Sequence, residues 1–186
     1  MNLTFKYIVL TLITSLFMCC GTNKTIKEAR VNTTPNAEYR ESRKAFADQL
    51  STSEYNNIKA ILEKELHTTI PNGKSILINF NQKASNCLEI RFNNIKGFVK
   101  RGMEISSKMS TKYNAIDFFV YTNDAYYKDI YEENPNFVLD SGFFRDNIFT
   151  LHENCKAFII IKPNGAFYKF YGEDYYSEVK KFFEQD

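Results

Sequence analysis

The clearest feature of the hydrophobic pattern is a short apolar run, Ile76–Phe80, of the kind that forms an interior strand buried on both faces. Polar, turn-prone residues follow at 81–86, so this strand must end there. Similar apolar runs occur at 115–121 and, more briefly, at 137–140. The pattern therefore predicts buried strands that are separated by polar segments.

Helical spacing of apolar residues marks the segments between these strands. Ser51 and Glu54 have the spacing of a capping box, and a helix follows them to about residue 66. A short helix is predicted over 125–133. A last helix has an apolar face made of Tyr175, Val179, Phe182 and Phe183.

A further helix is predicted to begin at Cys87. Asn86 is a suitable N-cap, and Glu89 stands three residues later, where a capping box requires an acid. The apolar positions behind it are Leu88, Phe92, Ile95, Val99 and Met103. The N–H groups and dipole of a helix N-terminus would stabilise a thiolate at Cys87. The alternative is an inert, half-buried cysteine that packs like a small apolar residue.

The C-terminal part of the chain has the pattern of a β-hairpin. Two apolar runs, 157–161 and 166–171, flank the sequence Lys-Pro-Asn-Gly at 162–165. Proline and glycine in this arrangement favour a tight turn between antiparallel strands.

The composition is that of one globular domain with a true core. The 186 residues are 44% hydrophobic and 25% charged, and the formal net charge is +2. Arg91, Lys96, Lys100 and Arg101 are close in sequence but would scatter over the outward face of a helix, so no nucleic-acid partner is expected. No Gly-rich phosphate loop, nucleophile elbow or zinc-finger spacing occurs, and no cofactor is expected.

The N-terminus has the form of an export signal. Lys6 precedes an apolar run over 7–20 that is too short for a comfortable membrane span. Its end, Leu-Phe-Met-Cys-Cys-Gly at 16–21, resembles the lipobox of bacterial lipoproteins, with Cys20 or Cys19 as the lipidated residue. This resemblance implies a lipid-anchored protein of the cell envelope that faces the periplasm and has the membrane as a partner.

The chain is accordingly divided into three parts. Residues 1–20 form the lipoprotein signal peptide and residues 51–186 form the folded domain. Between them, residues 21–50 are rich in Thr, Asn and charged residues without strong periodicity, which predicts a flexible tether.

The order of elements in residues 51–186 resembles the thioredoxin-like fold. The resemblance is carried by the strand directly before Cys87 and by the closing hairpin, KAFIIIKPNGAFYKFYG. It implies a three-layer α/β/α sandwich around a mixed sheet of about four to five strands. It also implies that Cys87 and Cys155 lie close together above the sheet.

The sequence departs from that family in its chemistry. Ala84 stands three residues before Cys87, so the Cys-x-x-Cys motif is missing, and Cys155 falls near the place of the family's cis-proline. His152 lies where copper-handling relatives of the Sco type carry a histidine. Dithiol exchange of the ordinary kind is therefore in doubt.

Several interpretations of Cys87 and Cys155 remain open. They can form a stable disulfide, stay apart as inert thiols, act as a catalytic redox pair, or join His152 in a soft-metal site. The first functional hypothesis is a lipid-anchored, thioredoxin-like envelope protein with at most a degenerate thiol site. If that site is active, it exchanges disulfides with client proteins through Cys87, with Cys155 as its partner. The second is a non-catalytic binding or scaffold lipoprotein that keeps the fold without the redox chemistry.

Overall fold

The structure is a computed structural model that describes residues 30–173 and 175–185. The predicted signal peptide, the lipidation candidates Cys19 and Cys20, and the first part of the predicted tether lie outside the described residues. Within the described residues, none of the helices combines the length and the apolar character needed to cross a membrane.

Six strands and five α-helices are described. The strands are β1 Lys44–Gln49, β2 Ser75–Asn81, β3 Ala115–Tyr121, β4 Phe137–Leu139, β5 Lys156–Ile161 and β6 Ala166–Tyr171. The helices are α2 Ala37–Ser42, α3 Thr52–Glu65, α4 Ile95–Lys112, α5 Lys128–Glu132 and α6 Tyr175–Phe183. A 3-10 turn at Leu88–Arg91 and a π-helical turn at Phe144–Ile148 complete the chain.

The six strands form one mixed sheet in the order β1-β6-β5-β2-β3-β4. β2 and β3 are parallel and are connected through α4, whereas β5 pairs antiparallel with both β2 and β6. The four central strands therefore have the thioredoxin-like arrangement that the sequence predicted. The short β4 extends the sheet at one edge and β1 extends it at the other.

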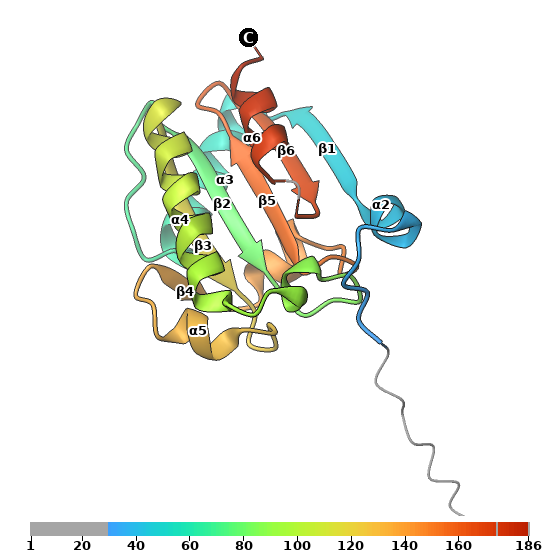
Figure 1. Cartoon of the computed structure of the whole chain (residues 1–186). Helices are drawn as coiled ribbons and strands as arrows, with labels where there is room; N and C mark the ends of the chain where they lie inside the picture. The colour runs from blue at the N-terminus through green and yellow to red at the C-terminus, as the bar shows by residue number, and fades with distance from the viewer. Residues whose placement is uncertain (1–29, 174, 186) are drawn as a thin grey trace, which may run out of the picture.

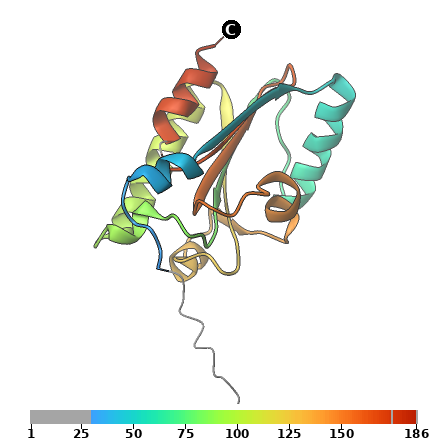
Figure 2. The same cartoon turned by 90° about the vertical axis from the view of Figure 1, so that its right-hand side faces the viewer.

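Helices cover both faces of the sheet. In Figure 1, α4 and α6 lie in front of the strands and α3 lies behind them. Figure 2 shows the sheet nearly edge-on between these two layers. The three-layer α/β/α sandwich is therefore confirmed, with six strands in place of the predicted four to five.

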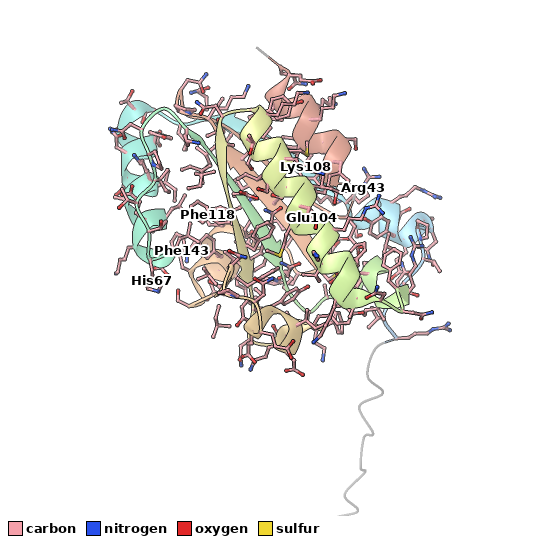
Figure 3. All side chains as sticks on the ribbon, turned by 60° about the vertical axis from the view of Figure 1, so that its left-hand side comes forward. Arg43, His67, Glu104, Lys108, Phe118 and Phe143 are labelled. Atoms are coloured by element: carbon pink, nitrogen blue, oxygen red, sulfur yellow. A yellow bond between two sulfur atoms is a disulfide. The ribbon has the colours of Figure 1, made fainter. Side chains whose placement is uncertain are left out.

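The alternation of side chains along the strands separates the two faces. Ile76, Ile78 and Phe80 of β2 pack into the core beneath α3, whereas Leu77 of the same strand packs beneath α6. Phe118 and Phe143 lie on the α3 side in Figure 3, while Glu104 and Lys108 lie along α4.

One part of the predicted tether belongs to the folded domain. Residues 37–49 form α2 and β1, and β1 pairs with β6 over its whole length, from Lys44 opposite Tyr171 to Gln49 opposite Ala166. Every residue of β1 is exposed, so no alternating apolar pattern marks it in the sequence. Backbone pairing with the free edge of β6 accounts for this sixth strand.

Candidate functional site

The sheet brings Cys87 and Cys155 together. β2 and β5 are antiparallel, with Asn81 at the end of β2 opposite Lys156 at the start of β5. The chain beyond these ends stays paired, because the backbone N–H of Gln82 donates to the carbonyl of Cys155 at 2.9 Å. The two cysteines, 68 residues apart in sequence, form a disulfide with 5.2 Å between their Cα atoms. The interpretation of two separate, inert thiols is therefore wrong.

The predicted helix N-terminus at Cys87 is also wrong. Asn86 is extended and forms β-bridges with Asn32 and Asn154, so it does not cap a helix. Cys87 precedes only the four-residue 3-10 turn. The long helix, α4, begins at Ile95, and the side chain of Asn94 caps it by accepting from the backbone N–H of Gly97 at 3.0 Å. The proposed stabilisation of a thiolate by a helix dipole has no basis here.

The disulfide is shielded from solvent. Cys87 is 0% exposed and Cys155 is 1% exposed. Asn32 lies against the segment that carries Cys87, since its backbone accepts from the N–H of Cys87 at 2.9 Å and donates to the carbonyl of Ser85 at 2.7 Å. Val31 packs on the cluster that contains both cysteines. The segment just before α2 thus covers the disulfide.

Two carboxylates face the sulfur atoms, that of the buried Glu89 and that of the partly buried Glu173. The Oε1 atom of Glu89 lies 3.9 Å from the Sγ of Cys87 and 4.0 Å from the Sγ of Cys155. The Oε1 atom of Glu173 lies 3.5 Å from the Sγ of Cys155 and accepts a hydrogen bond from the backbone N–H of Leu88. Sequence reasoning assigned Glu89 to a helix cap and did not single out Glu173, because only the fold places residue 173 beside residue 155.

One lysine balances part of this negative charge. The Nζ of Lys156 lies 2.7 Å from the Oε2 of Glu89 and donates to the side-chain oxygen of Asn81 at 3.1 Å.

Burial, and then the nearby charge of Glu89, raise the pKa of Glu173 to about 7. Burial is also the main reason that the pKa of Tyr131, whose hydroxyl lies 3.5 Å from Glu89, is well above its ordinary value.

His152 does not join this cluster. Its side chain is exposed, and its Nδ1 atom lies 2.9 Å from the Oε1 of Gln82. Among the described residues, the group with metal-ligand spacing is Cys87, Glu89 and Cys155, whose ligand atoms all lie within 4.8 Å of one another. In the part of the chain that the structure describes, Glu89 rather than His152 stands with the two cysteines at this spacing.

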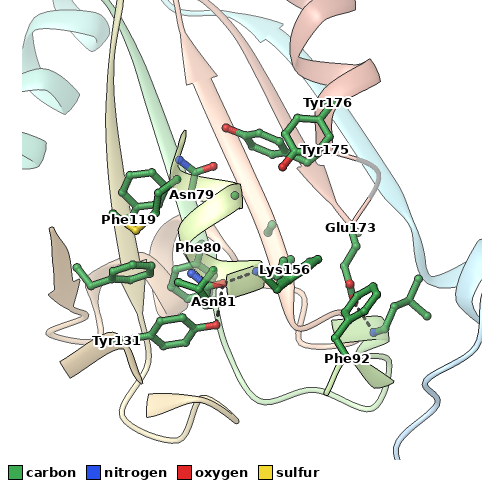
Figure 4. Close-up of a pocket in the computed structure, with 18 of the residues that line it drawn as sticks. Asn79, Phe80, Asn81, Phe92, Phe119, Tyr131, Lys156, Glu173, Tyr175 and Tyr176 are labelled. Atoms are coloured by element: carbon green, nitrogen blue, oxygen red, sulfur yellow. Dashed lines mark hydrogen bonds between the residues drawn. The ribbon is translucent and has the colours of Figure 1, made fainter. Parts of the chain in front are cut away.

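A cavity of about 270 Å³ lies next to the cluster, beneath α4 and the start of α6 (Figure 4). Eight of its 19 lining residues are aromatic, among them Phe92, Phe119, Tyr131, Tyr175 and Tyr176. Glu173 and Lys156 also line the cavity, so it borders directly on the charged groups beside the disulfide.

A chain of polar groups spans this face of the sheet. The side-chain amide of Asn79 donates to the hydroxyl of Ser106 at 3.1 Å, and Tyr175 donates to the same hydroxyl at 3.0 Å. These contacts tie β2, α4 and α6 together at the wall of the cavity. The cavity therefore has a fixed shape, aromatic walls and a few polar groups that converge from different elements.

No protein-family model and no curated protein matches the sequence. Among solved structures, the exposed lipoprotein thioredoxin of Streptococcus pneumoniae matches with a TM-score of 0.41 and 9% identity, covering 77% of this chain and 100% of that chain. The thioredoxin-like assignment rests on the strand order and strand directions of the chain itself.

Proposed function

We propose that the protein is a lipid-anchored, non-catalytic binding protein of the bacterial cell envelope. Its thioredoxin-like domain binds a small ligand in the cavity beneath α4 and α6. The Cys87–Cys155 disulfide supports the site and does not exchange with client proteins. The observation that carries this proposal is that both sulfur atoms are covered while an aromatic cavity lies beside them.

Thiol–disulfide exchange requires an attacking thiolate to reach one of the sulfur atoms. Neither sulfur is exposed, and the segment at Val31 and Asn32 packs over them. A closed disulfide adds about 2–4 kcal/mol to stability, mainly by restricting the unfolded chain. A structural role is therefore the simplest one for this pair.

The cavity has the character of a small-molecule site. Such sites are concave and mostly apolar, with a few polar groups that fix the orientation of the ligand. Aromatic side chains from α4, α6 and β3 supply the apolar surface, and Lys156 and Glu173 supply the polar end. The expected ligand is a small, flat or apolar molecule with one polar group.

Filling the cavity tests ligand binding. Gly102 of α4 lines the cavity, and a Cβ atom built there has no heavy atom within 4 Å. Gly102→Leu should therefore occupy the cavity without disturbing its walls. With indole as an aromatic probe, followed by the amide chemical shifts of Val99 and Phe119, we expect saturable binding to the wild type and at least about a tenfold weaker affinity in the variant.

The matched control is Lys100→Leu, which places the same side chain at an exposed position of α4 that does not line the cavity. This variant should bind indole as the wild type does. Equal loss of binding in both variants, or no binding by the wild type, would contradict the proposed site.

The lipid anchor has its own test. In bacteria fed labelled palmitate, the full chain should acquire label that Cys20→Ser or Cys19→Ser removes, with the double variant as the reference. Label that persists in the double variant would rule out the anchor and leave the binding test unaffected.

The second candidate function is thiol–disulfide exchange. It is favoured by the two carboxylates beside the disulfide, because Glu173, 3.5 Å from the Sγ of Cys155, is placed to exchange a proton with a leaving thiol. A redox role predicts a reduction potential near the roughly −200 mV of exchange proteins, whereas a structural disulfide should lie below about −300 mV. Equilibrium with a dithiol buffer of known ratio separates the two.

A further inference from the structure

We propose that reduction of the Cys87–Cys155 disulfide creates a buried Zn²⁺ site, in which the two thiolates and the carboxylates of Glu89 and Glu173 are the ligands. This site shares Glu173 with the wall of the aromatic cavity, but the proposal holds whether or not that cavity binds a ligand. The four side chains come from three separate places: the turn after β2, the start of β5 and the segment after β6.

The distances match a tetrahedral site. Zn–S bonds of about 2.3 Å and Zn–O bonds of about 2.0 Å place sulfur and oxygen ligands about 3.5 Å apart at the corners of a tetrahedron. The sulfur–oxygen distances are 3.9 Å and 4.0 Å from Glu89 to the two cysteines, and 3.5 Å from Glu173 to Cys155. The two sulfur atoms are closer than this because they are covalently bonded, and reduction removes that restriction. Cys87, Glu89 and Cys155 have ligand atoms within 4.8 Å of one another, and Glu173 stands outside that group but beside Cys155, so it must move toward the ion to become the fourth ligand.

The charges call for a cation once the disulfide is reduced. Two thiol groups would then lie beside two carboxylates in a region where Glu89 is 2% exposed and both cysteines are 1% exposed or less. Lys156 is the cation that pairs with Glu89 among the described residues. Loss of the thiol protons would add buried negative charge, which costs several kcal/mol where it is not compensated, so a divalent cation would stabilise the deprotonated site.

Neighbouring groups already hold the oxygen ligands in place. Lys156 binds the Oε2 of Glu89 at 2.7 Å, which leaves the Oε1 turned toward the sulfur atoms. The hydroxyl of Tyr131 lies 3.5 Å from that Oε1, and the N–H of Leu88 donates to the Oε1 of Glu173. Such outer contacts orient the ligands of known metal sites.

Carboxylate oxygens beside thiolates favour Zn²⁺ over Cu(I), which prefers sulfur ligands.

A route by which the ion reaches the site exists as well. Glu173 and Lys156 line the wall of the cavity that borders the cluster, so an ion can approach from that side without passing the cover formed by Val31 and Asn32.

The reaction balances with a small-molecule dithiol as reductant, which the cover that excludes client proteins need not exclude, because the cavity borders the cluster. The dithiol transfers two electrons and two protons to the Cys87–Cys155 bond and becomes a disulfide itself. The products are two thiols, and Zn²⁺ then displaces both thiol protons into solvent as the two Zn–S bonds form.

Cobalt spectroscopy tests the proposal directly. The protein is the full chain in detergent with Cys19→Ser and Cys20→Ser, so that Cys87 and Cys155 are its only cysteines. After reduction by a phosphine, Co²⁺ should bind one equivalent with thiolate-to-cobalt charge-transfer bands and the intense visible bands of a tetrahedral site. Addition of Zn²⁺ should remove these bands, and the oxidised protein should show none.

Isosteric variants identify the oxygen ligands. Glu89→Gln and Glu173→Gln should each weaken Zn²⁺ binding to the reduced protein at least about tenfold in competition with a chromophoric chelator. His152→Gln, which changes a neighbouring side chain outside the cluster, should leave the affinity unchanged.

Three results would overturn the proposal. They are equal Co²⁺ binding by the oxidised and reduced proteins, reduced protein that gives no charge-transfer band, and a loss of affinity in His152→Gln but not in the glutamate variants. The comparison of the oxidised and reduced proteins stands even if one glutamate variant fails to fold. None of these results bears on indole binding, so this proposal and the proposed function fail separately.

Discussion

The two faces of the sheet are built differently. On the α3 face, the side chains are apolar and closely packed, as in the stack of Phe80 on Phe149 with ring centroids 4.5 Å apart. On the α4 and α6 face, the cavity interrupts the packing, and Asn79 and Tyr175, which are partly buried, are hydrogen-bonded to the buried Ser106. Both faces use the same strands, so the difference comes from which residues alternate toward each side.

This difference assigns separate roles to the two faces. A filled apolar face contributes stability in proportion to the surface that it removes from water. A face with a cavity and buried polar groups gives up part of that stability and gains a place for a ligand. Cys87 lies beyond the last residue of β2 and Cys155 directly precedes the first residue of β5, so the disulfide lies at one edge of the face with the cavity. We therefore expect mutations on the α3 face to change stability, and mutations on the other face to change binding.

The largest expected effect is on the α3 face. Phe149→Ala removes a side chain that is 0% exposed and stacks on Phe80, which should cost about 3–5 kcal/mol of unfolding free energy in urea denaturation. Phe119→Ala, the matched change in the wall of the cavity, should cost only about 1–2 kcal/mol, since that side chain already lacks neighbours on one side. Equal costs would mean that the two faces are packed alike.

Loss of the disulfide should have the next largest effect. Cys87→Ala with Cys155→Ala opens a loop closed across 68 residues, and we expect a loss of about 2–4 kcal/mol in the same measurement. Indole binding should persist, because the walls of the cavity come from other residues. A double variant that stays folded yet binds no indole would show that the disulfide shapes the cavity.

The pH dependence of stability reports on Glu173. The pKa of its carboxyl group is raised from 4.5 to about 7 in the folded protein, so between these values the folded chain holds a proton that the unfolded chain has released. This contribution is fully present below pH 4.5 and is lost as the pH rises through 7, with a slope of at most about 1.4 kcal/mol per pH unit.

Glu173→Gln should reduce the loss of stability that accompanies rising pH. The measurement is the midpoint of urea denaturation from pH 4 to pH 8. Glu178→Gln is the control, because it changes an acid on α6 whose partner is the hydroxyl of Tyr168, away from the disulfide. The idea of a neutral, buried Glu173 fails if the slope of Glu173→Gln equals that of the wild type.

The smallest expected effects concern the helix caps. Ser51→Ala removes the acceptor for the N–H of Glu54 in α3, and Asn94→Ala removes the acceptor for the N–H of Gly97 in α4. Each should cost about 1 kcal/mol. Only Asn94→Ala should also weaken indole binding, since the first turns of α4 line the cavity and α3 does not. Weaker binding in both variants would argue against a division of roles between the faces.

Much of the fold was predictable because the pattern is strong where burial is high. The strands at 75–81, 115–121, 156–161 and 166–171 coincide with the apolar runs, and the capping box at Ser51 and Glu54 is confirmed. β1 escaped prediction because its side chains are exposed and only its backbone is paired. The helix predicted from Cys87 failed because Asn86 is held in an extended bridge, while Asn94 caps α4 instead.

The candidate site was less predictable. The sequence drew attention to Cys87 and Cys155 as a pair, and the structure joins them in a disulfide. It offered His152 as their neighbour, yet the groups that face the sulfur atoms are Glu89 and Glu173. The sequence around a glutamate does not show whether its carboxylate caps a helix or lies against a disulfide. The difference depends on contacts with segments that are far away along the chain.

By itself, the sequence determined the apolar strands and the order of most elements after residue 50, since these follow from local periodicity and turn chemistry, and that order carries the resemblance to the thioredoxin-like fold. Only the tertiary structure decided that the disulfide is shielded, that two carboxylates lie against it and that a cavity opens beside them. These features depend on contacts between residues 32, 89, 155 and 173, which are far apart along the chain and meet only when the sheet is assembled.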